Sequence, residues 1–127
     1  MEKILIVDDE VDILKVLRKY LQGDYNVLTA GEGRGALETC RREKPAVLVT
    51  DIRMPGMDGI ELIRRVRETN KEVEIIAITG HGDLRLSQES LQAGASDCLL
   101  KPIDIAMLGD SIERALNRLR LRQGVAT

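Results

Sequence analysis

The chain has 127 residues, a length suited to one domain, and its 19 Lys and Arg against 21 Asp and Glu leave a net charge of −2. This balance excludes a protein whose main work is to neutralise nucleic-acid phosphates, and two Tyr with no Phe or Trp exclude aromatic stacking platforms for single strands. A content of 43% hydrophobic and 31% charged residues is typical of a folded domain rather than a disordered chain.

Short apolar runs alternate with amphipathic segments along the chain. Runs typical of strands buried on both faces are residues 4–7, 27–28, 47–49, 75–78 and 99–100. Helical spacing of apolar residues covers 13–21, about 36–42, 60–66, about 84–93 and 105–119. Five strands alternating with five helices predict right-handed crossovers, and therefore an α/β fold with a doubly wound, five-stranded parallel sheet.

Polar residues follow the apolar runs, at the points where the predicted strands end. Asp8 and Asp9 follow the first run, Asp51 comes just after the third, Thr79 follows the fourth and Lys101 the fifth. Ligands of open α/β sheets bind beyond the carboxyl ends of the strands. We therefore expect three carboxylates, a hydroxyl and an ammonium group to meet at one edge of the sheet.

Three clustered carboxylates need a compensating charge. At about 4 Å and an effective dielectric constant near 20, each like-charge pair costs about 4 kcal/mol, so the cluster keeps a proton or binds a cation. Oxygen ligands without a His or Cys cluster favour Mg²⁺. Such an ion leaves coordination positions for a phosphoryl group, which Asp51 can accept as a mixed anhydride. Lys101 and Thr79 can contact the phosphoryl oxygens, and Gly80 leaves the approach open.

Four motifs in this order, IVDDE, VTDIRMPGMDG, ITG and LLKP, resemble those of response-regulator receiver domains, the CheY-like switches of two-component signalling. The resemblance covers residues 3 to about 120. It implies a flavodoxin-like sheet with strand order 2-1-3-4-5. We expect the receiver domain at residues 1–122, and a C-terminal tail or the start of a linker at 123–127.

The resemblance also implies roles for single residues. Asp51 is the expected phosphorylation site, Thr79 the switch hydroxyl and Lys101 the contact to phosphate. The expected Mg²⁺ ligands are Asp8, Asp9, Asp51 and the backbone carbonyl of Arg53. The expected structural residues are Pro55 and Gly59, in the turn and helix start after the phosphorylation site, Gly80, and Pro102, whose bond to Lys101 is cis in this family, unlike most X-Pro bonds.

The chain departs from the family pattern at Cys98. Receiver domains usually carry Tyr or Phe at this switch position, three residues before the lysine, and that ring swings inward on activation. Cys98 is interpreted as a small apolar filler. We therefore expect the signal to travel through loop and helix shifts instead of an aromatic rotamer.

The function that this resemblance implies is a phosphorylation-dependent signalling switch, not a conventional enzyme. It takes a phosphoryl group onto Asp51 from the phosphohistidine of a sensor kinase or phosphotransfer protein, with Mg²⁺, and loses it by hydrolysis. Phosphorylation then changes the surface formed by the helix at 84–93, the strand at 99–100 and the helix at 105–119. That surface controls an effector domain or target protein, and its two helices can form a homodimer.

The cellular setting is predicted from what the chain lacks. No apolar run approaches the roughly 20 residues that span a bilayer, and the apolar start is too short for a signal peptide. Cys40 and Cys98 form neither a zinc motif nor a disulfide framework. A cytoplasmic protein that binds neither membrane nor nucleic acid directly is expected.

Two other functions fit parts of the pattern. A Mg²⁺-dependent aspartyl-nucleophile phosphatase of the haloacid-dehalogenase type needs Asp-x-Asp after the first strand, whereas Asp8 and Asp9 are adjacent. A flavodoxin-like module for FMN needs a phosphate-binding loop after the first strand, where the two carboxylates of this chain repel phosphate. It also needs an aromatic residue to stack on the flavin, and neither Tyr of this chain follows a predicted strand.

Some charged residues have simpler interpretations. Glu10 favours the start of the first helix. Arg53 is either a solvated loop residue or a gate on water access to the phosphoryl group, and His81 is interpreted as exposed. The arginines of the last helix are interpreted as a solvated face, with partner docking or a DNA-adjacent role as the alternative: Arg114, Arg118, Arg120 and Arg122.

Overall fold

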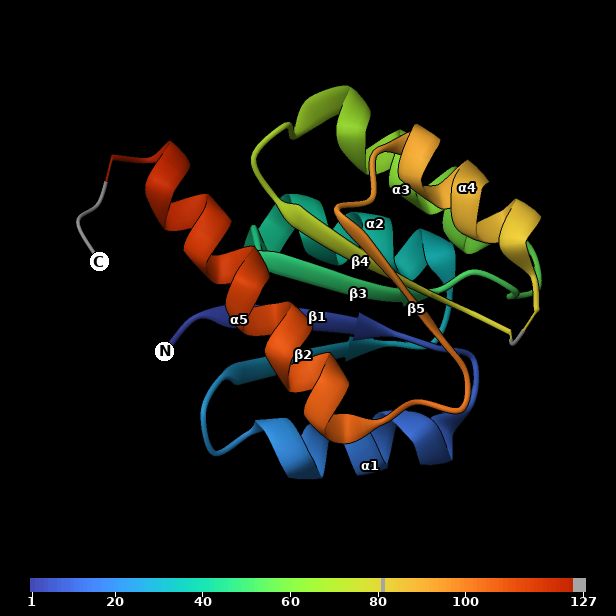
Figure 1. The fold of residues 1–127 in the computed structure, drawn as a ribbon, viewed down its shortest axis with the longest axis horizontal. Helices are drawn as coiled ribbons and strands as arrows, with labels where there is room; N and C mark the ends of the chain where they lie inside the picture. Colours follow the sequence, from blue (N-terminus) through green and yellow to red (C-terminus); the bar gives the residue numbers. More distant parts are fainter. Residues whose placement is uncertain (81, 125–127) are drawn as a thin grey trace.

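The computed structural model describes residues 1–80 and 82–124, in which five strands alternate with five helices (Figure 1). The strands are β1 (Lys3–Val7), β2 (Asn26–Ala30), β3 (Val47–Asp51), β4 (Glu74–Thr79) and β5 (Asp97–Leu100). The helices are α1 (Val11–Leu21), α2 (Gly33–Glu43), α3 (Gly59–Thr69), α4 (Leu84–Ala93) and α5 (Ile105–Arg122). All ten predicted elements are confirmed, with some longer than their apolar patterns.

The strands form one parallel sheet in the order β2-β1-β3-β4-β5, so the predicted doubly wound topology is confirmed. Helices α2, α3 and α4 cover one face, and α1 and α5 cover the other (Figure 1). The register pairs Val7 with Thr50 and Asp51 with Ile78, which brings the carboxyl ends of β1, β3 and β4 to one edge.

The core lies on both sides of the sheet because the central strands are apolar throughout. Along β1, Leu5 packs toward α2 and α3, whereas Ile4 and Ile6 pack toward α1 and α5. All three are at most 1% exposed. Burying one such side chain contributes about 1.5–3 kcal/mol, so the central strands form a rigid base for the residues at their ends.

Aspartates fix the starts of three helices. The side chain of Asp58 accepts the Glu61 N–H at 2.9 Å, and Asp83 and Asp104 cap α4 and α5 in the same way. Such a cap contributes about 1 kcal/mol. Glu10 occupies the position before α1, as expected, without a side-chain capping bond.

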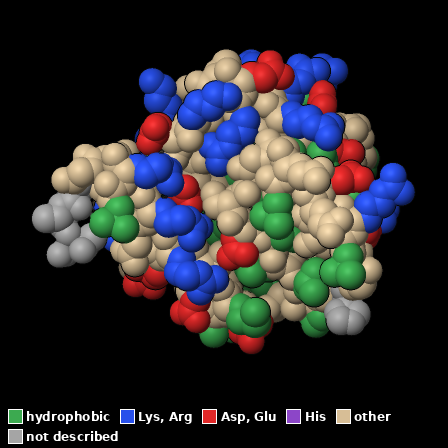
Figure 2. All heavy atoms as spheres, turned by 45° about the horizontal axis from the view of Figure 1, so that its top comes forward, with side chains coloured by type: hydrophobic (Ala, Val, Ile, Leu, Met, Phe, Trp, Pro, Cys, Tyr) green, Lys and Arg blue, Asp and Glu red, His purple; other side chains and the backbone are tan. Residues whose placement is uncertain are grey.

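The interpretation of the α5 arginines as a solvated face is wrong for Arg118 and Arg122, which reach a buried carboxylate. Arg118 and Arg122 contact the buried carboxylate of Glu74 at 2.7 and 2.6 Å, and Arg114 lies 3.3 Å from Asp97. Figure 2 shows this face, with Lys and Arg side chains in a band near the C-terminal end and acidic side chains beside them. The pairs tie α5 to the amino ends of β4 and β5.

Within the described part of the chain, no helix is long and apolar enough to cross a bilayer.

Candidate functional site

Three aspartates meet at the carboxyl edge of the sheet. Asp8 directly follows β1, Asp9 comes next, and Asp51 is the last residue of β3. One carboxylate oxygen from each lies within 4.8 Å of the others. Asp8 and Asp51 are buried, at 3% and 5% exposure, whereas Asp9 is exposed. The parallel sheet therefore brings together the three carboxylates that the strand ends led us to expect.

The buried carboxyl group of Asp8 is unfavourably placed as an anion. Burial raises its pKa, and the negative charges of Asp51 and Asp9 raise it further, although the Glu10 N–H donates to it at 2.9 Å and lowers it. A hard divalent cation would relieve this repulsion, and carboxylate oxygens are the ligands that it prefers. The residues present therefore fit a Mg²⁺ ion.

Lys101 and Thr79 complete the edge. The Lys101 ammonium lies 3.1 Å from Asp51 Oδ2. Burial lowers the pKa of Lys101, but the hydrogen bond and the charge of Asp51 outweigh it, so the pKa lies above its usual value. Thr79 is the last residue of β4, 1% exposed, and its hydroxyl donates to the Gly80 carbonyl at 3.1 Å. Lys101 is thus engaged with Asp51 already, while the hydroxyl is turned toward the backbone.

Gly59 holds the loop after Asp51 in place. Its N–H donates to the Ile52 carbonyl at 2.8 Å, and a Cβ at this position would lie 2.3 Å from the Asp51 carbonyl oxygen. Only glycine allows this close approach of two backbone segments. The exposed Pro55 lies in the loop between them, and the assignment of the Arg53 carbonyl as a metal ligand stays a prediction.

The side chain of Arg53 forms a contact that the sequence did not predict. Its guanidinium lies 2.9 Å from Asp83, the residue that caps α4. The hydrogen bond from Arg53 lowers the pKa of Asp83. Asp83 was missed as a functional candidate, although an Asp just before an amphipathic stretch is a recognisable start of a helix.

Cys98 lies on the edge strand β5, half-buried against the α4 side of the core. The Ser87 hydroxyl of α4 donates to its sulfur at 2.9 Å. Cys98 therefore fills space as expected and also accepts a weak hydrogen bond, which the sequence did not predict.

The cis bond expected between Lys101 and Pro102 is present. His81 lies outside the described residues.

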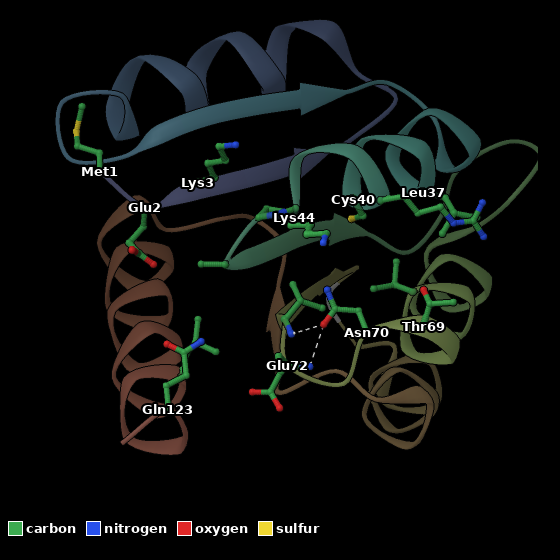
Figure 3. A pocket seen from close by; sticks show the side chains of 16 residues that line it. Met1, Glu2, Lys3, Leu37, Cys40, Lys44, Thr69, Asn70, Glu72 and Gln123 are labelled. Atoms are coloured by element: carbon green, nitrogen blue, oxygen red, sulfur yellow. Dashed lines mark hydrogen bonds between the residues drawn. The ribbon is translucent and has the colours of Figure 1, made fainter. Parts of the chain in front are cut away.

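A hollow of about 780 Å³ lies at the opposite edge of the sheet (Figure 3). Its lining comes from the start of the chain and from the C-terminal ends of α2, α3 and α5. Beside it, the Asn70 side chain accepts the N–H groups of Glu72 and Val73, drawn as dashed lines in Figure 3. The hollow lies at the amino ends of the strands, so it is separate from the acidic site.

The order of these site residues along the chain is the order found in a known protein family. The sequence model for the response regulator receiver domain matches residues 4–113. The chain belongs to this receiver-domain family. It is similar to the C4-dicarboxylate transport transcriptional regulatory protein DctD of Pseudomonas aeruginosa, with 40% identity over 121 residues, which cover 94% of this chain and 26% of that protein. It therefore spans about a quarter of that relative's length.

Other relatives have the size of a receiver domain alone. Sporulation initiation phosphotransferase F of Bacillus subtilis is 35% identical over 116 residues, covering 91% of this chain and 94% of that protein. The crystal structure of a receiver domain protein from Clostridium thermocellum matches with a TM-score of 0.91 and 31% identity, covering 95% and 98% of the two chains. The receiver fold of this chain is therefore shown by sequence and structure together.

Proposed function

We propose that this receiver domain is a phosphorylation-dependent switch in which Asp51 accepts a phosphoryl group from the phosphohistidine of a sensor kinase or phosphotransfer protein. The observation that carries the proposal is the convergence of three carboxylates with Lys101, whose ammonium lies 3.1 Å from Asp51 Oδ2. A structural salt bridge alone would not need two further carboxylates beside it, because each adds repulsion.

Asp8, Asp9, Asp51 and the backbone carbonyl of Arg53 are the groups that would hold Mg²⁺. When bound, this ion offsets the negative charge that gathers on the carboxylates and on the phosphoryl oxygens. Support comes from Asp8, whose raised pKa reflects burial beside like charges. The exposure of Asp9 leaves the cluster open to solvent on one side.

In the proposed reaction, an Asp51 carboxylate oxygen bonds to phosphorus as the phosphorus–nitrogen bond of the donor histidine breaks. The electron pair of that bond stays on the imidazole, and an acyl phosphate forms. Lys101 then pairs with a phosphoryl oxygen instead of Asp51 Oδ2. The Thr79 hydroxyl leaves the Gly80 carbonyl and donates to the phosphoryl group, which shifts the loop before α4. Attack of water on phosphorus then breaks the bond to the Asp51 oxygen, which releases inorganic phosphate and restores the carboxylate.

Labelling by a small phosphoryl donor tests this function. Acetyl phosphate with Mg²⁺ is expected to add one phosphoryl group per chain, removable by hydroxylamine, and EDTA should suppress it. Intact-mass spectrometry before and after hydroxylamine measures the result. Continuous turnover of phosphate esters without a stable label would favour the alternative of a Mg²⁺-dependent phosphatase. A chain that neither takes a label nor turns over phosphate esters would contradict both functions.

Thr79→Ala is expected to separate phosphorylation from the response to it. The variant should still take up one phosphoryl group because Asp51 and Lys101 are intact. Its amide spectrum in the loop before α4 and in α4 should change much less than that of the unaltered chain, since no hydroxyl follows the phosphoryl group. Backbone amide NMR with and without acetyl phosphate measures this. Equal spectral changes in both proteins would contradict the role of Thr79.

Domain limits and partners complete the proposal. Helix α5 ends at Arg122, which supports a receiver domain at 1–122 followed by a tail or linker at 123–127, of which 125–127 lie outside the described residues. We propose that α4, β5 and α5 form the surface that changes, and that α4 and α5 can join two copies of the chain. The names of several longer relatives are those of transcriptional regulators, which supports an effector domain as the output.

A further inference from the structure

Helix α4 has no fully buried apolar residue. Among its ten residues only Ser90 is buried, whereas five residues are buried in α3. Leu84 and Leu91 are 70% and 47% exposed. Its apolar contacts with the core come from Leu86 and Ala93, which are only partly buried, so α4 depends largely on its polar contacts to keep one position. The polar contacts of α4 with other elements lie mainly at its two ends, and they differ in how exposed they are.

The C-terminal end of α4 is clamped by an arginine of α3. Arg67 donates from Nε and Nη2 to the Gly94 carbonyl at 3.0 and 2.9 Å, and from Nη1 to the Asn70 carbonyl at 3.3 Å. A Cβ at Gly94 would lie 2.7 Å from Arg67 Cγ, and Gly94 has a φ of +126°. The guanidinium, the turn and the end of α4 therefore fit together closely. This end is fixed by a partly buried, bidentate contact.

The N-terminal end is held by a weaker contact beside the acidic site. Arg53 lies 2.9 Å from Asp83, with side chains 75% and 24% exposed. Exposed ion pairs contribute little and break easily. Between the two ends, the Ser87 hydroxyl donates to the Cys98 sulfur, which is a weak acceptor. The exposed ion pair at the N-terminal end thus joins α4 to the loop that directly follows Asp51.

We propose that the Arg53–Asp83 ion pair is a releasable latch on the N-terminal end of α4, and that the Arg67–Gly94 contact is the pivot about which the freed helix turns. What releases the latch rests on the proposed function. A phosphoryl group on Asp51 offers charged oxygens two residues away from Arg53, and these compete with Asp83 for its guanidinium. Asp83 continues to cap α4 after Arg53 leaves, so the helix moves without unwinding.

The latch can be tested without any phosphoryl donor. Asp83→Asn removes the charge but keeps a side chain that caps helices equally well. Hydrogen exchange of the amides of residues 87–89 should become roughly two- to fivefold faster, as expected for the loss of one exposed ion pair. Exchange at Gly94 and Ala95 should not change. The matched control is Arg65→Gln, which breaks the exposed Arg65–Glu61 pair on α3 and should change neither region.

Two further measurements complete the test. Arg67→Leu should speed exchange at Gly94 and Ala95, because it removes the clamp and leaves the latch. Beryllium fluoride, an analogue of the phosphoryl group, should bind Asp83→Asn roughly two- to fivefold more tightly than the unaltered chain, since binding and latch opening are reciprocally coupled.

The outcomes separate the two proposals. Unchanged exchange in Asp83→Asn, or equal acceleration along the whole of α4, overturns the latch and pivot whatever happens at Asp51. Failure of beryllium fluoride to bind the unaltered chain contradicts the proposed function instead, while the exchange data still decide the latch.

Discussion

Asp51→Asn is expected to abolish labelling by acetyl phosphate, the largest change in activity that any single substitution at the site should cause. The amide keeps the size of the side chain, and its oxygen can still accept from Lys101, which lies 3.1 Å from Asp51 Oδ2 in the unaltered chain. It lacks the anionic oxygen that forms the bond to phosphorus. Intact-mass spectrometry after incubation with acetyl phosphate and Mg²⁺ measures the loss.

Two controls make this result specific. Asp24→Asn removes one exposed carboxylate far from the acidic edge in the sequence, and it should be labelled like the unaltered chain. Circular dichroism of Asp51→Asn should match that of the unaltered chain, because the substitution replaces a nearly isosteric side chain. A label of full stoichiometry on Asp51→Asn would place the phosphoryl group elsewhere and remove the basis of the proposed function.

The acidic edge could be predicted from the sequence because a parallel sheet leaves little freedom in where strand ends go. Once residues 4–7 and 47–49 are assigned to neighbouring strands, Asp8 and Asp51 must lie at the same edge. Lys101 follows from the same argument on the last strand. Short side chains fixed to the ends of buried strands have few alternative positions, so the backbone alone brings them together.

Two of the contacts missed from the sequence are made by long arginine side chains. Arg53 reaches Asp83 across 30 positions of the chain, and Arg118 reaches Glu74 across 44. Such a side chain can extend toward several elements with similar energy, and the choice depends on packing that no periodic pattern records. This is why the arginines of α5 were interpreted as solvated, whereas its apolar stripe was recognised.

Glu74 shows how much such a missed contact can contribute. Glu74 is the first residue of the interior strand β4 and is 3% exposed. The guanidinium groups of Arg118 and Arg122 on α5 contact its carboxylate. Burial raises the pKa of Glu74, but the hydrogen bonds from Arg118 and Arg122 lower it more, so the pKa lies below the usual Glu value. The folded state therefore stabilises the anion, and the two arginines join α5 to the sheet at the edge opposite Asp51.

Glu74→Gln is consequently expected to lower the free energy of unfolding by on the order of 3 kcal/mol at pH 7. Removing one partner of a buried ion pair costs about 3–5 kcal/mol, and the lower value applies because both arginines are partly exposed and can be hydrated. Urea denaturation measures the change. Glu38→Gln, which removes an exposed partner of Arg42, is the matched control and should change stability by less than about 0.5 kcal/mol.

The pH dependence of this difference gives a second, independent check. A carboxyl group whose pKa is lower in the folded state adds stability above its unfolded pKa of about 4.3 and loses that contribution as the pH falls through the folded value. The difference between the unaltered chain and Glu74→Gln should therefore be full at pH 7 and shrink below about pH 4. A difference that stays constant down to pH 3 would mean that the lost contact is steric rather than ionic, and that the charge of Glu74 does not hold α5 against the sheet.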